Sequence, residues 1–225
     1  MIGGSTLTIG GRAAAMHTAG PATRADAGVI VLHPWWGLNA DVRTFADRLG
    51  EAGFAAVAPD LYGGEVAATI PEAERLSSDL NEDLADALVL ASVDALGERI
   101  GDPAAKIGAI GFSMGGAWAL WLPAQRPEVA ATVVYYGSIE GPSLTRARVP
   151  VLGHFAESDP YESDDGLASF EQTLRGAGRE VTIHRYPGTG HWFAEPSTDA
   201  YNAEASELAF DRTVEFLRRH LSHEG

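Results

Sequence analysis

The sequence contains no cysteine among its 225 residues. Disulfide bonds, thiolate metal ligands and a cysteine nucleophile are therefore excluded. No apolar stretch reaches the roughly 20 residues that a bilayer-spanning helix requires. The opening residues, MIGGSTLTIGG, also lack the basic start and long apolar core of a signal peptide. We therefore expect a cytoplasmic protein that does not associate with membranes.

Basic residues are scarce: 16 lysines and arginines stand against 31 aspartates and glutamates, a net charge of −15. The electrostatic field of this negative charge repels nucleic acids and anionic membranes, so neither is an expected partner. The most acidic segment, residues 157–165, lacks the spaced ligands of a calcium loop. The charge pattern therefore indicates a soluble protein without a metal site.

Short apolar runs, typical of strands covered on both faces, alternate with helical patterns along the chain. The runs predict strands at residues 28–32, 54–58, 107–110, 132–136, 149–155 and 181–186. Two further strands are expected within residues 5–19, around the Gly10-Gly11 turn, followed by a loop over 21–26.

Helical spacing predicts a helix capped by Asn39 or Asp41 and ended by Gly53. An apolar stripe from Leu76 to Leu96 predicts a long helical stretch, with a possible break near Asn81. Further helices are expected from Gly115, over 166–176 and over 200–220. The helix from Gly115 is apolar nearly all round and should be buried. This alternation predicts one α/β domain over residues 1–225, with a mostly parallel sheet and helices on both faces.

The most informative segment is Gly111-Phe-Ser113-Met-Gly115, which lies between a predicted buried strand and a helix. It fits G-x-S-x-G, the sharp turn that lifts a serine hydroxyl above the end of a sheet. In a chain with 26 glycines this pattern alone is weak evidence for such a turn. The prediction therefore depends on the position of the pattern between a strand and a helix. Ser113 is therefore the candidate nucleophile.

A serine nucleophile needs a base, and that base needs a partner that fixes its tautomer. His191 lies in the loop after the last predicted strand, and Asp159 lies just beyond the preceding strand. The order Ser113, Asp159, His191 is the order of catalytic residues that accompanies this turn. His33 also follows a strand, but it precedes the serine and fits a loop role better.

An oxyanion hole needs two N–H donors. Met114, directly after the nucleophile, should supply one, and the loop after the 28–32 strand should supply the other. Pro34 has no N–H, so Trp35 is the expected donor. Trp36, Tyr136 and Trp192 flank the same segments and predict an aromatic substrate pocket.

From residue 28 onward, the sequence resembles the dienelactone hydrolase family of α/β-hydrolases. The resemblance is carried by motifs in order along the chain: LHPWWGLN at 32–39, APDLYG at 58–63, GAIGFSMGG at 108–116, YYG at 135–137, HFAESD at 154–159, GHWF at 190–193 and AFDRTVEFL at 209–217. It implies a compact α/β-hydrolase core with no large cap domain. It also implies ester or lactone hydrolysis through an acyl-enzyme, without a cofactor, by Ser113, Asp159 and His191.

Three departures from the family pattern bear on substrate choice. Ser113 stands where the family prototypes have cysteine, and Pro34 stands where they have an activating glutamate. Glu195 replaces an arginine that holds a substrate carboxylate, while Arg75 is the only basic residue between Arg48 and Arg99. A buried carboxylate without a cationic partner is costly. We therefore expect small, neutral, apolar or aryl esters as substrates, with Glu195 in the pocket wall.

Other functions remain open at this point. The same residues could serve acyl transfer or peptide hydrolysis, because the sequence does not separate water from other acceptors. A catalytically silent small-molecule-binding protein on the same fold is a further alternative. Either a monomer or a homodimer is compatible with the acidic surface.

Overall fold

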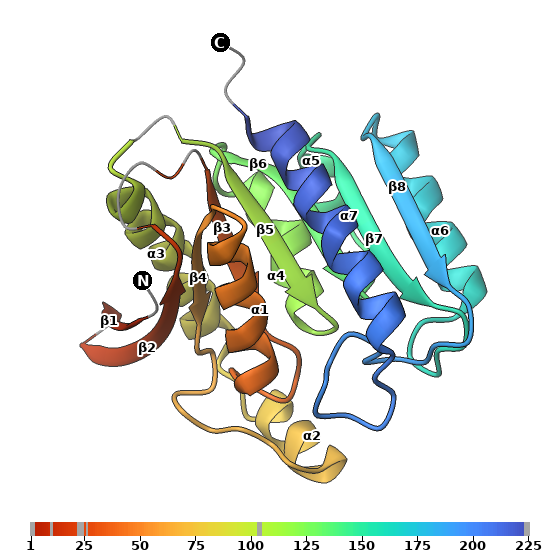
Figure 1. Cartoon of the computed structure of the whole chain (residues 1–225), viewed down its shortest axis with the longest axis horizontal. Helices are drawn as coiled ribbons and strands as arrows, with labels where there is room; N and C mark the ends of the chain where they lie inside the picture. The colour runs from red at the N-terminus through yellow and green to blue at the C-terminus, as the bar shows by residue number, and fades with distance from the viewer. Residues whose placement is uncertain (1–2, 10, 22–24, 26, 103–104, 223–225) are drawn as a thin grey trace.

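The computed structural model describes residues 3–9, 11–21, 25, 27–102 and 105–222. Within these residues, eight strands form one sheet in the order β1-β2-β4-β3-β5-β6-β7-β8 (Figure 1). The pairs from β4 through β8 are all parallel, and the N-terminal strands β1 and β2 add antiparallel at one edge. The predicted α/β fold with a mostly parallel sheet is confirmed.

The strands are β1 (Gly3–Ile9), β2 (Arg12–Ala19), β3 (Gly28–Leu32), β4 (Ala55–Pro59), β5 (Ile107–Phe112), β6 (Val129–Tyr135), β7 (Val151–Ala156) and β8 (Val181–Tyr186). All residues of β3, β4, β5 and β7 are buried. Such continuous burial explains why these strands read as uninterrupted apolar runs. Because β3 to β8 run parallel, their carboxyl ends meet at one edge of the sheet.

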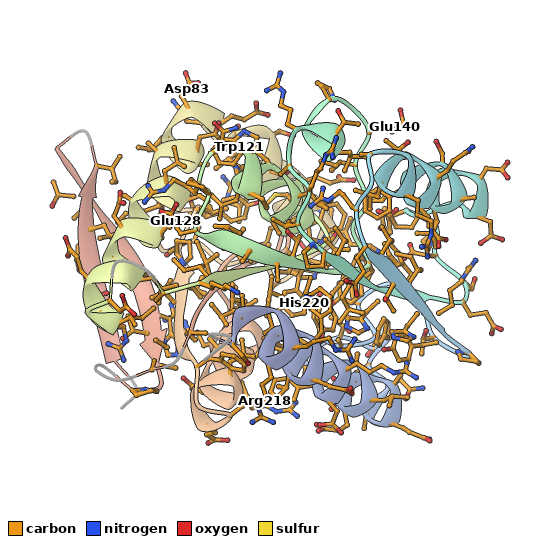
Figure 2. The ribbon with its side chains drawn as sticks, turned by 90° about the horizontal axis from the view of Figure 1, so that it is seen from above. Asp83, Trp121, Glu128, Glu140, Arg218 and His220 are labelled. Carbon is orange, nitrogen blue, oxygen red and sulfur yellow. The ribbon has the colours of Figure 1, made fainter. Side chains whose placement is uncertain are left out.

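The helices are α1 (Ala40–Glu51), α2 (Ile70–Ser78), α3 (Glu82–Ile100), α4 (Gly115–Trp121), α5 (Ser143–Arg146), α6 (Asp164–Gly176) and α7 (Ala203–Leu221). Helices α1 and α7 cover one face of the sheet, and α3, α4 and α6 cover the other (Figure 1). Seen from above, Arg218 and His220 of α7 lie on the opposite side of the sheet from Asp83 of α3 and Trp121 of α4 (Figure 2).

Polar residues fix where most helices begin. The side chains of Asn39, Asn81, Ser163 and Asn202 each accept a backbone N–H in the first turn of α1, α3, α6 and α7. Thr69 and Glu72 of α2 form a reciprocal capping box. Each such cap stabilises its helix by about 1 kcal/mol. The break predicted near Asn81 is therefore real, and it separates α2 from α3.

The core has two layers, one on each face of the sheet. Val29 and Val31 face α1 and α7, whereas Ile30 and Leu32 face α3, as the two-residue period of a strand requires. Phe45 of α1 makes edge-on contacts with three other aromatic rings at 4.9 to 5.5 Å. Burying one such side chain contributes about 2 kcal/mol.

The predicted loop at 21–26 falls mostly outside the described residues and stays a prediction. One expectation differs from the structure. Helix α4 is less buried than its composition predicts: Ala119 and Leu120 are buried, but Trp118 and Trp121 are half-buried. The Trp118 indole nitrogen donates a 2.7 Å hydrogen bond to Asp86, so this ring forms a polar contact at the surface of α3. In the described residues, no helix is long and apolar enough to cross a bilayer.

Candidate active site

Ser113 lies at the turn between β5 and α4, with a left-handed φ of 46°. The turn brings backbone segments so close together that side chains on its flanking glycines would clash. A Cβ on Gly111 would lie 2.3 Å from the carbonyl oxygen of Gly115, and a Cβ on Gly115 would lie 2.3 Å from that of Leu32. The glycines of the motif are therefore a steric requirement of the turn that exposes Ser113.

Ser113, His191 and Asp159 lie in a hydrogen-bonded line. Ser113 Oγ lies 3.0 Å from Nε2 of His191, and Nδ1 of His191 lies 2.7 Å from Oδ2 of Asp159. An ionised carboxylate only accepts hydrogen bonds, so Nδ1 carries the proton and Nε2 accepts from the serine hydroxyl. The side chains of His191 and Asp159 are 4% and 2% exposed. The structure thus brings together the three residues that the sequence singled out.

The carboxylate of Asp159 is held by its own loop. Oδ1 accepts the backbone N–H groups of Tyr161 at 2.9 Å and Glu162 at 3.3 Å, which leaves Oδ2 for His191. Glu162 in turn accepts the backbone N–H of Ser138 at 2.9 Å and bonds the hydroxyl of the same residue. The loop after β7 is therefore tied to the loop after β6, which the sequence did not predict.

Among the described residues, only three that are not glycine have a left-handed φ: Ser113, Tyr136 and Trp192. Each follows a strand of the parallel sheet, and all three belong to the candidate site. A left-handed non-glycine residue costs on the order of 1–3 kcal/mol, and such residues cluster at functional sites. The packing of the surrounding structure therefore offsets the cost of three strained backbone conformations at this edge of the sheet.

The expected oxyanion donors are both available. Met114 precedes the first residue of α4, and Trp35 lies in the loop after β3. In the part of the chain that the structure describes, neither backbone N–H donates to another protein group. An oxyanion hole requires N–H donors that are not already bonded, and both groups meet that condition.

His33 belongs to the loop and not to the hydrogen-bonded line of Ser113. Its ring is fully buried, with Nδ1 2.7 Å from the carbonyl oxygen of Pro34 and Nε2 3.1 Å from the backbone nitrogen of Leu61. Burial lowers the pKa of His33 and keeps the ring neutral, although the Pro34 carbonyl and Asp60 act in the opposite direction.

Aromatic rings cover the candidate site. Trp35, Trp36 and Trp192 lie with ring centroids 5.2 to 6.0 Å apart. Tyr161 contacts the rings of Trp35 and Trp192, and its ring centroid lies 4.8 Å from that of His191. Sequence reasoning missed Tyr161, although its position two residues after Asp159 was a usable signal. The cluster shields His191 from water.

Tyr136 and Glu195 form a buried pair beside His191. The Tyr136 hydroxyl donates a 2.8 Å hydrogen bond to Oε1 of Glu195, and the Tyr136 ring centroid lies 4.9 Å from that of His191. Burial raises the pKa of Glu195 to about 8, with Asp41 adding to the rise and the tyrosine opposing it. Glu195 is therefore mostly protonated at neutral pH.

A groove of about 700 Å³ lies next to the aromatic cluster. Trp36, Trp192, Val66 and Ile70 contribute apolar walls, and Asp41 and Asp199 contribute carboxylates. Of the residues that the structure describes, no lysine or arginine lines it. Of the four residues predicted to line a substrate pocket, Trp36 and Trp192 line this groove. Tyr136 and Glu195 do not, because they are buried against each other.

Arg75 forms ion pairs away from this groove. It contacts Glu65 at 2.9 Å and Asp79 at 3.4 Å, so its charge is already compensated. In the described residues, no group of three or more histidine, aspartate or glutamate side chains could hold a metal ion. Arg75 is thus not placed to hold an anion in the groove.

Known proteins are similar to this chain over most of its length. The sequence model of the dienelactone hydrolase family matches residues 14–221. "Protein usf" of Aquifex pyrophilus is 32% identical over 208 residues, covering 87% of this chain and 89% of the relative. A protein of Aquifex aeolicus (strain VF5) named "Putative carboxymethylenebutenolidase" is 31% identical over 216 residues, covering 90% of each chain.

The fold is also shared with a solved structure, the dienelactone hydrolase-like promiscuous phosphotriesterase P91 from metagenomic libraries. It superposes with a TM-score of 0.80 at 23% identity and covers 98% of this chain and 99% of its own. The family match begins within β2, covers β3 to β8 and includes all three residues of the hydrogen-bonded line. The chain belongs to the dienelactone hydrolase family.

Proposed function

We propose that this protein is a serine hydrolase that cleaves carboxylic esters or lactones through an acyl-enzyme on Ser113. The observation that carries the proposal is the hydrogen-bonded line Ser113–His191–Asp159, at 3.0 and 2.7 Å. Membership of a family named for lactone hydrolysis supports the reaction class. A serine nucleophile requires a base in contact with its hydroxyl, and His191 meets that requirement.

In the first half-reaction, Ser113 Oγ attacks the substrate carbonyl carbon while Nε2 of His191 takes its proton. Asp159 stabilises the imidazolium that forms. The N–H groups of Met114 and Trp35 hold the negative charge that develops on the carbonyl oxygen. His191 then passes the proton to the leaving oxygen, which leaves as an alcohol or, in a lactone, stays attached to the acyl group.

In the second half-reaction, His191 takes a proton from water, and the resulting hydroxide attacks the acyl carbon. The same two N–H groups stabilise the second tetrahedral intermediate. Its collapse returns the proton from His191 to Ser113 Oγ and releases the carboxylic acid. Water and one base are therefore sufficient, and no cofactor takes part.

Ser113 does not line the groove, but Trp36 and Trp192 belong both to the groove and to the aromatic cluster over the candidate site. If the substrate extends from Ser113 into the groove, the groove favours small, neutral substrates with apolar or aryl groups. Trp36 and Trp192 offer flat apolar surfaces, and an anionic substrate would find Asp41 and Asp199 without a compensating cation. The sequence predicts that Glu195 supplies this negative charge. Because Glu195 is buried and mostly protonated, the two aspartates set the sign of the groove instead.

The test is covalent labelling with a serine-directed aryl phosphonate, followed by turnover of aryl esters. We expect one adduct on the wild type and on Ser169→Ala, an exposed serine of α6 that serves as the control. Ser113→Ala should take no label and lose turnover. An unlabelled wild type, or an equal adduct on Ser113→Ala, would reject the proposal. Labelling without turnover of any ester would favour a binding role, and turnover only with alcohol or amine acceptors would favour acyl transfer.

A further inference from the structure

His33 makes two hydrogen bonds whose directions are fixed by chemistry. The carbonyl oxygen of Pro34 can only accept, so the His33 Nδ1 at 2.7 Å must carry a proton. The backbone N–H of Leu61 can only donate, so the His33 Nε2 at 3.1 Å must present a lone pair. The ring is therefore neutral, in a single tautomer, and it links the loop after β3 to the segment after β4.

The Pro34 carbonyl belongs to the same peptide unit as the N–H of Trp35. In a trans peptide, the carbonyl and the following N–H point in opposite directions within one plane. The carbonyl oxygen accepts from His33 and also from the backbone N–H of Gly37 at 3.1 Å. Two donors on the carbonyl thus fix the plane, and with it the direction of the Trp35 N–H on the opposite side.

We propose that His33 is a positioning residue that aims the Trp35 N–H at the developing oxyanion by holding the Pro34 carbonyl. The inference rests on the proposed function, because it takes Trp35 as an oxyanion donor. His33 acts through the peptide and does not touch the substrate. Burial of the ring, which is 0% exposed, excludes water that would otherwise compete for the carbonyl.

Two substitutions separate the hydrogen bonds of His33. Asparagine can place an amide N–H near the position of Nδ1, so His33→Asn keeps a donor for Pro34. Glutamine places its amide near Nε2, so His33→Gln keeps an acceptor for Leu61 and loses the donor. We expect kcat to fall about 10- to 100-fold in His33→Gln and only a few-fold in His33→Asn, with KM nearly unchanged in both. His154→Gln, another fully buried histidine, is the control for a general packing defect.

A thiono ester, in which sulfur replaces the carbonyl oxygen, tests the oxyanion hole directly. A general packing defect should not change the preference for an ester over its thiono analogue. Sulfur fits an oxyanion hole poorly, so the wild type should prefer an ester over its thiono analogue, and His33→Gln should reduce that preference. His154→Gln should keep the wild-type preference whatever its stability. Equal kcat losses in His33→Asn and His33→Gln, or an unchanged thiono preference in His33→Gln, would overturn the inference. A wild type with no ester turnover and no label on Ser113 would instead reject the proposed function.

A measurement on the wild type avoids the risk that both variants misfold. Nitrogen-15 NMR of the histidine rings should show His33 as the Nδ1–H tautomer, with a slowly exchanging ring proton. Phosphonylation of Ser113 places a tetrahedral oxygen in the oxyanion hole, and it should shift that ring proton. The Nε2–H tautomer, a charged ring at pH 7, or no shift on labelling would contradict the assignment.

Discussion

The hydroxyl of Tyr136 donates a 2.8 Å hydrogen bond to Oε1 of Glu195, and both side chains are buried. The same tyrosine ring contacts His191, so the protonation of Glu195 is linked to the packing beside the base. Oε2 of Glu195 has no hydrogen-bond partner among the described residues. A charge on this carboxyl group would therefore be poorly compensated.

Glu195→Gln should flatten the pH dependence of stability. The native state keeps the Glu195 proton up to about pH 8, whereas the usual pKa is 4.5. The native state thus binds the extra proton between these values. The contribution of Glu195 to the free energy of unfolding is fully present below pH 4.5. It is lost as the pH rises to about 8, and the free energy of unfolding falls by at most about 1.4 kcal/mol per pH unit.

Urea unfolding at pH 5 and pH 8.5 measures this effect. Relative to wild type, Glu195→Gln should lose less stability between the two values, because glutamine keeps the oxygen that accepts from Tyr136 and does not ionise. The matched control is Glu204→Gln, an exposed glutamate in the first turn of α7. Parallel pH profiles for wild type and Glu195→Gln would contradict the prediction.

Asp159→Asn should leave the fold intact and lower kcat by about 10⁴-fold, because an amide no longer selects the productive tautomer of His191. Its Oδ1 can still accept the N–H groups of Tyr161 and Glu162. The measurement is steady-state hydrolysis of a neutral aryl ester, with the melting temperature as a check on folding. The control is Asp165→Asn in the first turn of α6. A loss below about tenfold would argue against Asp159 as the partner of the base.

Tyr161 should matter for its ring and not for its hydroxyl. The ring packs on His191, Trp35 and Trp192, but its hydroxyl bonds to no protein group in the described residues. Tyr161→Phe should therefore keep wild-type kcat/KM. Tyr161→Ala should lose about five- to tenfold, since one aromatic contact contributes about 1 kcal/mol. A large loss in Tyr161→Phe would show that the hydroxyl acts directly.

Asp199→Lys should shift the charge preference of the groove. Asp199 is exposed on the wall of the groove, so a lysine there would attract an anionic substrate with about 1 kcal/mol. The ratio of kcat/KM for an anionic ester over its neutral analogue should rise about fivefold, and less at high salt. Asp211→Lys, at an exposed position of α7, should leave the ratio unchanged. An unchanged ratio in Asp199→Lys would place substrate binding elsewhere.

Local patterns were sufficient to predict the elements that carry the candidate site. Ser113, Asp159 and His191 each follow an apolar run, and the rule that parallel strands end at one edge was enough to bring them together. The break at Asn81 could also be expected, because a capping residue and a change of helical phase coincide there.

What the sequence could not predict depends on contacts between distant segments. Glu195 reads as a charged loop residue, and only its burial against Tyr136, 59 positions earlier, makes it mostly neutral. The position of Tyr161 over His191 depends in the same way on how two loops pack. Helix α4 is apolar in composition, but whether Trp118 is buried depends on where α3 places Asp86.

Ser113, Tyr136 and Trp192 hold left-handed backbone conformations at the edge where the reaction is proposed. Replacing Tyr136 or Trp192 with glycine would relieve that strain, but it would also remove a ring packed near His191. At Tyr136, which is fully buried, the cavity left by glycine would cost more than the strain it removes, so heat resistance and the candidate site favour the same residue. At the half-buried Trp192, selection for heat resistance alone would tolerate the loss of a ring that belongs to the candidate site. A selection that demands turnover alongside heat resistance would keep these residues and gain its stability elsewhere, for example in the antiparallel β1–β2 hairpin at the edge of the sheet.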